Sequence, residues 1–409
     1  MRVAYTALAK FDESPAIGDQ LFYNAAANCL KNGKGLVEPF DLRARERGEI
    51  RACVNPAADH PPLTVLVLAP VSLATGESPN AQRLAMTVLG TVAVLVIGLV
   101  GRAVGGDRVG WCSAAIAAIS PNLWVNDALI MSETLAVLAT VLALLCAYRM
   151  LRAPTLRVAV ALGACSGLAA LARAELVLLI PLLAVPAALL ARGDRARRVR
   201  LAVAGAVAGA LVLAPWLVFN VVRFDEPTFM STNEGIALAG SNRDSVYHGP
   251  GTGLTDLECC GPPYPDGDQS EISKVYRRRA LDYIRAHEKR AVIVALARVG
   301  RTWSLFRPGD MLDYNEGEAR ERWVTVLGLV AFYPMLVGAL TGVVVLRRRR
   351  ATWWPLVVPV VVVTVASAAT YGQTRFRAPA EPSLTILSAV ALAALVGRQP
   401  RRMEASSSR

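Results

Sequence analysis

The chain has 409 residues, of which 54% are hydrophobic and 19% are charged, and its mean hydropathy is +0.40. This composition excludes an ordinary soluble protein, which is less apolar. The net charge of +12 does not indicate nucleic-acid binding, because the basic residues form short tracts between apolar runs, without interleaved aromatic residues or a groove-forming module.

Residues 1–80 are predicted to form an extracytoplasmic first loop. The opening MRVAYTALAKFDESP contains no signal peptide that could translocate this segment, and VAYTALA resembles the last turns of a span. We therefore expect a preceding span to be missing. Cys29 and Cys53 lie in polar stretches where a disulfide is permitted outside the cytoplasm. The apolar stretch 63–76 would make a helix of about 21 Å, too short to span, so we expect an interfacial helix.

Nine apolar segments follow, most of them close to the length that crosses a hydrocarbon core of about 30 Å. They are residues 81–101, 109–126, 132–151, 156–172, 175–191, 199–222, 322–346, 353–370 and 379–397. Every second connection between them is rich in arginine, and the positive-inside rule places these connections in the cytoplasm. The sequence therefore predicts an all-α, polytopic membrane protein.

The same rule divides the chain by sidedness. Residues 81–222 would hold six spans, residues 223–321 a large extracytoplasmic loop, residues 322–397 three further spans, and residues 398–409 a cytoplasmic tail. Within the large loop we expect one helix over about residues 270–305. Its apolar side, with Ile272, Val275, Tyr276 and Tyr283, is typical of a helix on the membrane surface.

Three arginines fall in outer connections, where arginine is rare: Arg173 in LARAEL, and Arg375 and Arg377 in YGQTRFRAP. A guanidinium at the membrane edge matches a phosphate or pyrophosphate bidentately. The alternative is structural, with Arg173 paired to Glu175 and one of the later arginines paired to Glu381, or simple snorkelling.

Acidic residues gather on the same predicted face. They are Asp19 in AIGDQLFYNAA, Asp59 beside His60 in ADHPPL, and Asp127 and Glu133 in NDALIMSE. Each taken alone is typical of a helix cap. Together with the arginines they suit group transfer from a phosphate-activated donor, since a carboxylate can deprotonate an attacking hydroxyl.

A metal site would have to involve Asp59 and His60, the candidates for a divalent ion, with further ligands from elsewhere. The alternative is an ordinary polar pair before a helix that begins with proline. The sequence implies no other cofactor.

The order of these motifs resembles polytopic C-type (GT-C) glycosyltransferases, in particular glycosyltransferase family 39 with the protein O-mannosyltransferases, and the aminoarabinose transferases. The resemblance rests on Asp19 and Tyr23 followed by KNGKGLVEP, then DHPPLTVLVLAP, SPNLWVNDALIMSETL, Arg173 with Glu175, TNEGIALAGSN, and YGQTRFRAPAEPSL. Gln20 follows Asp19 where some relatives have a second acid, so a role that needs two adjacent carboxylates is not expected.

The resemblance implies a cell-envelope enzyme that moves a sugar from a polyprenyl-phosphate-linked donor with inversion. The acceptor would be a protein, lipid or polysaccharide at the extracytoplasmic face of the cell membrane. Asp19 would be the catalytic base or the carboxylate that positions the acceptor, and Glu133 would be a second catalytic acidic residue. Donor and carrier phosphate would meet Arg173, Arg375, Arg377, Tyr23 and His60, with Asp59, Glu175, Asn233 and Asn242 as supporting polar groups.

Two other functions are compatible with the same residues. One is a transporter or flippase of a lipid-linked or anionic substrate, although no internal repeat is visible and the charges lie at the outer edge of the predicted spans. The other is a non-catalytic relative that has kept the fold.

Overall fold

The computed structural model describes residues 1–11, 13–15, 18–40 and 52–396. Within these ranges the chain is helical, and its only extended pairing is an isolated bridge between Val37 and Pro56. The prediction of an all-α membrane fold is therefore confirmed. The elements, in which η marks short 3-10 or π turns, are α1 (Arg2–Tyr5), η1 (Thr6–Lys10), α2 (Gly18–Lys31), α4 (Leu63–Thr75), α5 (Pro79–Gly105), α6 (Asp107–Ile119), α7 (Pro121–Asp127), α8 (Glu133–Arg152), α9 (Leu156–Ala172), η2 (Ala174–Leu178), η3 (Ile180–Ala184), α10 (Val185–Leu189), α11 (Arg195–Arg223), α12 (Glu234–Ser241), α13 (Asp244–Tyr247), η4 (Leu257–Cys260), α14 (Gln269–Ala286), α15 (Glu288–Thr302), α16 (Asp310–Glu316), α17 (Arg322–Arg348), α18 (Trp354–Ala369), η5 (Thr374–Ala380) and α19 (Glu381–Val396).

Each of the nine expected spans coincides with helix. Among the residues that the structure describes, five segments are long and apolar enough to cross a membrane: α5, α8, α11, α17, and η5 with α19. The other apolar helical segments are shorter. The second expected span is divided into α6 and α7 at Ser120, which has an extended backbone and is followed by Pro121, a residue without an N–H. The count of nine and the domain division by sidedness stay predictions.

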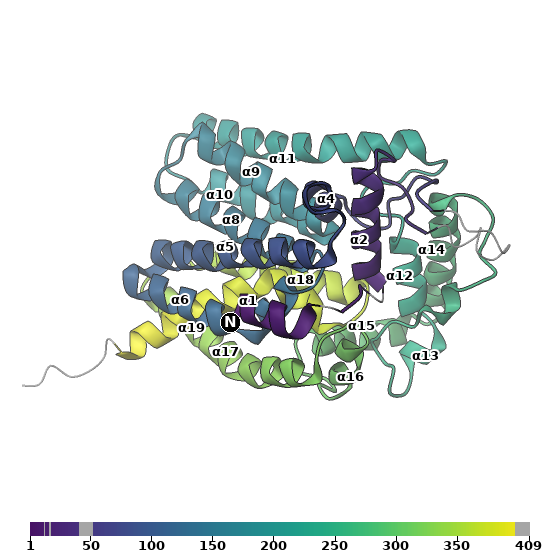
Figure 1. Ribbon diagram of the computed structural model, residues 1–409. Coiled ribbons are helices and arrows are strands. Elements are labelled where there is room, and N and C mark those ends of the chain that lie inside the picture. Colours follow the sequence, from purple (N-terminus) through teal and green to yellow (C-terminus); the bar gives the residue numbers. More distant parts are fainter. Residues whose placement is uncertain (12, 16–17, 41–51, 397–409) are drawn as a thin grey trace, which may run out of the picture.

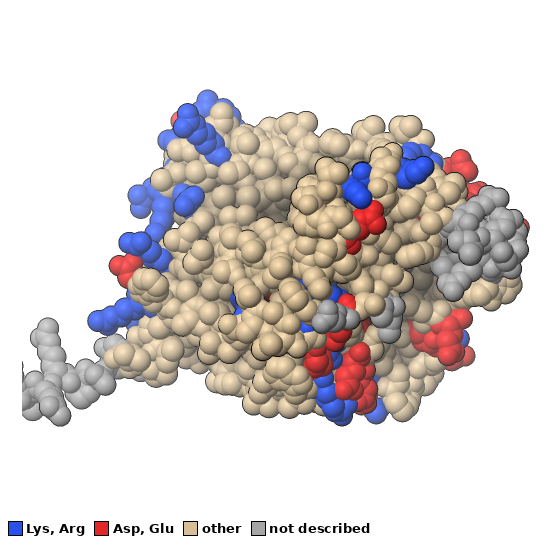
Figure 2. Space-filling view, viewed as in Figure 1, with Lys and Arg blue, Asp and Glu red and all other residues tan. Residues whose placement is uncertain are grey.

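The long helices lie side by side and give the bundle two different ends (Figure 1). Lys and Arg side chains gather at the left end, where α5 turns into α6 and α10 into α11 (Figure 2). The opposite end carries α2, α12 and α14, and we call it the loop end. Helix α4 is seen end-on beside the lengthwise α5 (Figure 1), and its interfacial position stays a prediction.

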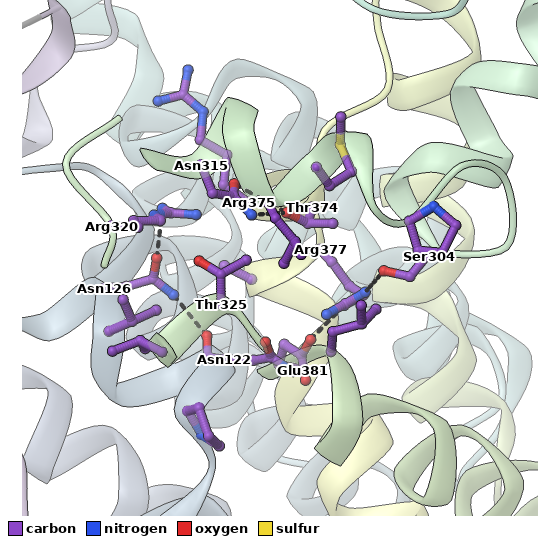
Figure 3. A pocket seen from close by; sticks show the side chains of 18 residues that line it. Asn122, Asn126, Ser304, Asn315, Arg320, Thr325, Thr374, Arg375, Arg377 and Glu381 are labelled. Carbon is purple, nitrogen blue, oxygen red and sulfur yellow. Dashed lines mark hydrogen bonds and ion pairs between the residues drawn. The ribbon is translucent and has the colours of Figure 1, made fainter. Parts of the chain in front are cut away.

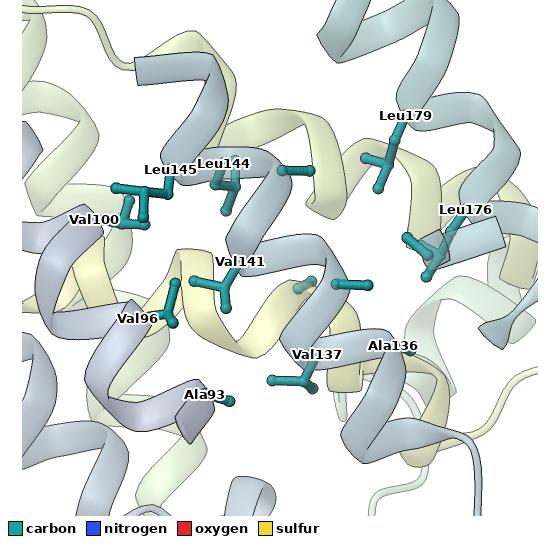
Figure 4. Close-up of a cluster of buried hydrophobic side chains, with 14 of the residues drawn as sticks. Ala93, Val96, Val100, Ala136, Val137, Val141, Leu144, Leu145, Leu176 and Leu179 are labelled. Carbon is teal, nitrogen blue, oxygen red and sulfur yellow. The ribbon is translucent and has the colours of Figure 1, made fainter. Parts of the chain in front are cut away.

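Helix α8 lies at the centre of the core. Apolar residues lie on all sides of this helix, and most of them are buried. Val137, Val141 and Leu144 of α8 belong to one hydrophobic cluster together with Val96 of α5 and Leu176 of η2 (Figure 4). A central helix of this kind fixes the position of Glu133, its first residue, at the loop end.

Helices α9 and α11 pack against each other through glycines. Gly163 and Gly167 are four residues apart on α9, and Gly205 and Gly209 have the same spacing on α11. A Cβ atom at Gly163 would overlap the carbonyl oxygen of Gly205. Small residues at this spacing let two membrane helices approach closely, and this packing holds the turn after α9, which carries Arg173, in place.

The loop end is held together by the first loop and α14. Cys29, near the end of α2, and Cys53 form a disulfide with a Cα–Cα distance of 5.7 Å, which the sequence only permitted. Helix α14 begins with a capping box made by Asp268 and Glu271.

The expectation of one helix over residues 270–305 is wrong, because the segment forms α14 and α15. The break is at His287, whose Nδ1 contacts the carbonyl oxygen of Tyr283 at 2.9 Å, while its N–H bonds to Ile284 instead. The carbonyl that would continue the helix is thus occupied by a side chain. The predicted apolar side does exist, but Ile272 and Tyr276 are buried in a cluster with Ala239 of α12.

Candidate functional site

A cavity of about 390 Å³ opens at the loop end. Its walls come from α2, the first loop, the turn after α9, the segment around α12, the chain before α17, and η5. Segments that are far apart in sequence therefore converge there. Eight of the residues singled out in the sequence line the cavity: Asp19, Tyr23, Asp59, His60, Arg173, Glu175, Asn233 and Arg375.

Asp19 and Arg375 meet in this cavity. Gly18 has a φ of +57°, a conformation that glycine adopts readily, and it starts α2 so that Asp19 stands in the first turn. Arg375 lies in η5, and its Nη1 donates to Asp19 Oδ2 at 2.8 Å. The Asp19 side chain is 27% exposed, so it remains open to the cavity.

His60 is the second partner of Asp19, with Nε2 3.5 Å from Asp19 Oδ1. Burial by itself would raise the pKa of Asp19, but Arg375 and then His60 outweigh it, so the pKa lies well below its ordinary value. Burial alone would lower the pKa of His60. The Asp19 carboxylate outweighs that effect and raises the His60 pKa above 6.5.

Three carboxylates surround the guanidinium of Arg375. Besides Asp19, its Nε lies 3.4 Å from Glu318 Oε1 and 3.9 Å from Glu133 Oε1. Nε also donates to Gln373 Oε1 at 3.0 Å, and the side chain is only 10% exposed. This excess of negative charge fixes the arginine at the wall of the cavity.

Arg173 is the second cation of the cavity. Its Nε donates to Glu175 at 2.6 Å and its Nη1 to Glu133 at 3.1 Å, and its guanidinium lies 4.8 Å from the centre of the Phe376 ring. The structural ion pair with Glu175 considered above is thus present. Glu133 is 1% exposed and does not line the cavity. It lies behind the wall and links Arg173 to Arg375.

Two aromatic rings enclose His60. The ring centroids of Tyr23 and Phe22 lie 5.2 Å and 5.1 Å from that of the imidazole. Tyr23 is 2% exposed, and burial, followed by the charge of Asp19, raises its pKa. These contacts set the orientation of the imidazole toward Asp19.

Besides Glu133, two of the predicted residues lie outside the cavity. Asn242 is buried, where it accepts from the Tyr247 hydroxyl at 2.7 Å and from Arg298 Nη2 at 3.0 Å. Arg377 is 3% exposed and donates from Nε to Glu381 Oε1 at 2.5 Å. For Arg377 the structural ion pair considered above is therefore present.

Arg377 borders a second, smaller cavity of about 40 Å³, which shares Arg375 with the main one. Figure 3 shows the Arg377–Glu381 pair on one side of it and a hydrogen bond of 2.9 Å from Arg320 to Asn126 on the other. With a free volume of about 40 Å³, this cavity is too small for a sugar.

The residues around Asp59 and His60 do not fit a metal ion. Asp59 Oδ2 accepts from Gln269 at 3.0 Å, whereas His60 directs Nε2 to Asp19. Across the part of the chain that the structure describes, no group of three or more His, Cys, Asp and Glu side chains converges on one point.

Sequence reasoning missed Glu318, Tyr314 and Tyr371, which also line the cavity. Glu318 belongs to a charged stretch, GEARERW, directly before a predicted span. Glu133 was selected as a candidate from a similar position at the start of a predicted span, so the same criterion could have identified Glu318. Nothing in the pattern distinguishes the two tyrosines.

Known proteins resemble this chain in sequence over one segment and in fold over nearly all of it. Residues 59–219 match the family described as dolichyl-phosphate-mannose-protein mannosyltransferase. No curated protein sequence matches the chain significantly.

Solved structures of the oligosaccharyltransferase AglB from Archaeoglobus fulgidus share the fold. The apo form aligns with a TM-score of 0.54 and 15% identity over 96% of this chain and 48% of that one. The complex with an inhibitory peptide and a dolichol-phosphate aligns with a TM-score of 0.52 and 16% identity over 93% and 46%. This chain thus spans about half the length of that protein. ArnT from Cupriavidus metallidurans bound to undecaprenyl phosphate aligns with a TM-score of 0.46 and 16% identity over 97% and 77%.

Proposed function

Because this chain is a polytopic membrane protein with the fold of C-type glycosyltransferases, we propose that it transfers a sugar from a polyprenyl-phosphate-linked donor to an acceptor at the extracytoplasmic face. The resemblance to these enzymes predicted from the sequence is confirmed by the family match and by the fold. The observation that carries the proposal is the contact between Asp19 and Arg375 in an open cavity.

Asp19 is the base in this proposal. An acceptor hydroxyl attacks C1 of the sugar from the side opposite the carrier, its proton passes to the Asp19 carboxylate, and the bond from C1 to the phosphate oxygen breaks. The carrier leaves as polyprenyl phosphate and the configuration at C1 is inverted. Asp19 suits the role because it is a partly exposed carboxylate that lines the cavity and contacts Arg375.

Arg375 and Arg173 bind the carrier phosphate in this proposal. Negative charge grows on the phosphate as the bond to C1 breaks, and cations fixed in advance stabilise it best. Both guanidiniums line the cavity and both are held by Glu133, which keeps them on the same side. The family match to a dolichyl-phosphate-mannose transferase, and the dolichol-phosphate bound in the AglB structure, support a lipid phosphate as the ligand.

The test is sugar transfer in membranes that contain the full chain. A radiolabelled polyprenyl-phosphate sugar is supplied, and label in the acceptor fraction is measured for the native chain and for Asp19→Asn. We expect Asp19→Asn to lower product formation by about 10²-fold or more, because a general base contributes about 10²–10⁴-fold. Asp282→Asn is the matched control, since Asp282 is 63% exposed on α14 and lines no described cavity. Unchanged transfer by Asp19→Asn would remove Asp19 from the mechanism.

The same membranes distinguish the enzyme from a transporter. If the labelled donor crosses the bilayer at a rate that depends on this chain, and no labelled acceptor forms, the chain moves its lipid substrate instead of using it. If neither process depends on the chain, it is a non-catalytic relative of the fold.

A further inference from the structure

A second opening lies beside the main cavity and has a different lining. It encloses about 190 Å³ between α2, the first loop, α12 and the start of α14. We call it the aromatic groove. Its lining residues are Phe22, Glu38, Pro39, Phe40, Asp59, Thr232, Asn233, Ile236, Tyr264, Gln269 and Ile272.

The aromatic groove joins the main cavity, because Asp59 and Asn233 line both. Phe22 of the groove contacts the His60 ring with a centroid distance of 5.1 Å, and His60 Nε2 lies 3.5 Å from Asp19. The rings of Phe22 and His60 thus lie between this part of the groove and the carboxylate proposed as base. A molecule bound in the groove could extend a hydroxyl group past Asp59 into the main cavity.

Gln269 gives the groove a fixed polar wall. Its Nε2 donates to Glu38 Oε1 at 2.7 Å and to Asp59 Oδ2 at 3.0 Å. Its Oε1 accepts from the Ala58 N–H at 3.1 Å and from the Thr232 hydroxyl at 3.0 Å. The amide therefore connects the first loop to α14 and holds two carboxylates in place. A ligand that binds at this wall would require little rearrangement of its side chains.

Another part of the lining is apolar and aromatic. Phe40 is 44% exposed although it borders a concave site, and Tyr264, Phe22 and Ile236 continue this surface. An exposed ring beside fixed carboxylate and amide groups matches a ligand that has a C–H face and a hydroxyl edge. Sugar rings have this combination, whereas a lipid tail has no hydroxyl edge.

Resting on the proposed transfer reaction, we propose that the aromatic groove binds a sugar unit of a glycan acceptor, with a hydroxyl of the acceptor directed to Asp19. The volume supports a small ligand, since it lies below the range of about 300–1,000 Å³ for drug-sized ligands and holds about one sugar ring. The acceptor is then a saccharide, and the rest of its chain lies outside the groove.

The test is saturation-transfer NMR on the purified full chain in lipid nanodiscs, without donor. The probes are neutral trisaccharides of hexoses and pentoses, compared with a serine- and threonine-containing peptide. We expect binding of at least one trisaccharide, weakened roughly tenfold by Phe40→Ala, because a stacked ring contributes about 0.5–1.5 kcal/mol. Phe40→Tyr keeps a ring and should retain binding. Phe229→Ala, at an exposed ring that lines neither opening, is the matched control.

Two results would overturn the inference: no trisaccharide binds, or the bound one is insensitive to Phe40→Ala. Peptide binding that depends on Phe40, without saccharide binding, would also overturn it and assign a protein acceptor. The Asp19→Asn chain separates this inference from the proposed reaction. If transfer depends on Asp19 but no saccharide binds, only the groove assignment fails. If a saccharide binds but transfer does not depend on Asp19, only the proposed reaction is refuted.

Discussion

Asp19 Oδ2 and Arg375 Nη1 lie 2.8 Å apart, although 356 positions separate the two residues in the chain. The guanidinium keeps Asp19 ionised and lowers its pKa, so in this arrangement the carboxylate is a poor base. In the proposed reaction the donor phosphate competes with Asp19 for Arg375. Donor binding would then weaken this contact and raise the basicity of Asp19 when the acceptor arrives.

Arg375→Ala should weaken donor binding by about tenfold to a hundredfold, because a hydrogen bond to a charged group contributes about 1.5–3 kcal/mol. Acceptor binding should change less. The measurement is a binding titration of the purified chain with polyprenyl phosphate, followed by one with an acceptor. Arg278→Ala, at an exposed arginine of α14, is the control. Equal weakening of both ligands would instead assign Arg375 to a purely structural ion pair.

His60 should make stability depend on pH. Its pKa is raised in the folded chain, so protonated His60 stabilises the fold fully below about pH 6.5, and this contribution is lost as the pH rises through the folded pKa. The melting temperature measured in detergent should therefore fall as the pH is raised from 6 to 9, and this fall should be absent in His60→Gln. The chain has three histidines, and His248→Gln should keep the decline. A slope unaffected by His60→Gln would show that His60 is not paired to Asp19.

Arg377 and Glu381 should act as a structural pair. Arg377→Met leaves a buried, uncompensated carboxylate, so we expect a loss of about 3–5 kcal/mol in the free energy of unfolding. Arg377→Met combined with Glu381→Leu should recover most of that loss, because an apolar pair replaces the buried ions. Thermal unfolding of the single and double variants measures both effects. A double variant no more stable than the single one would argue for a role of Arg377 outside this pair.

Gly163→Leu should separate α9 from α11, because a side chain at this position overlaps the Gly205 carbonyl. Overpacking costs about 1–3 kcal/mol, and the displaced α9 would also move Arg173. Val160→Leu enlarges an exposed position of the same helix and serves as the control. Gly163→Leu should lower both the melting temperature and the affinity for the donor, whereas Val160→Leu should change neither. Equal stability of the two variants would show that the helices do not need this close contact.

The sequence predicts most of the helices because long apolar runs have few alternatives in a bilayer. It places Asp19, His60, Arg173 and Arg375 at one end because the alternation of basic connections assigns sides. Sidedness does not assign contacts, so Arg377 was grouped with Arg375 although its partner is Glu381. The break between α14 and α15 was also beyond prediction, since it depends on one histidine side chain bonding a carbonyl.

The groove and Glu318 depend on tertiary contacts between distant loops. Gln269 joins Glu38, Ala58 and Asp59 across more than two hundred positions, and no local pattern marks it. Glu318 lies directly before a predicted span, but its approach to Arg375 at 3.4 Å could not be predicted from that position.

The long separation of Asp19 and Arg375 also has a consequence for biosynthesis. During translation the acids Asp19, Glu133 and Glu318 are all made before η5, so a nascent chain that ends after α18 holds three carboxylates without this arginine. Insertion of the last helical segment, η5 with α19, is therefore the event that brings Arg375 to these carboxylates, and a chain stalled before residue 375 would have only Arg173 of the two cavity arginines.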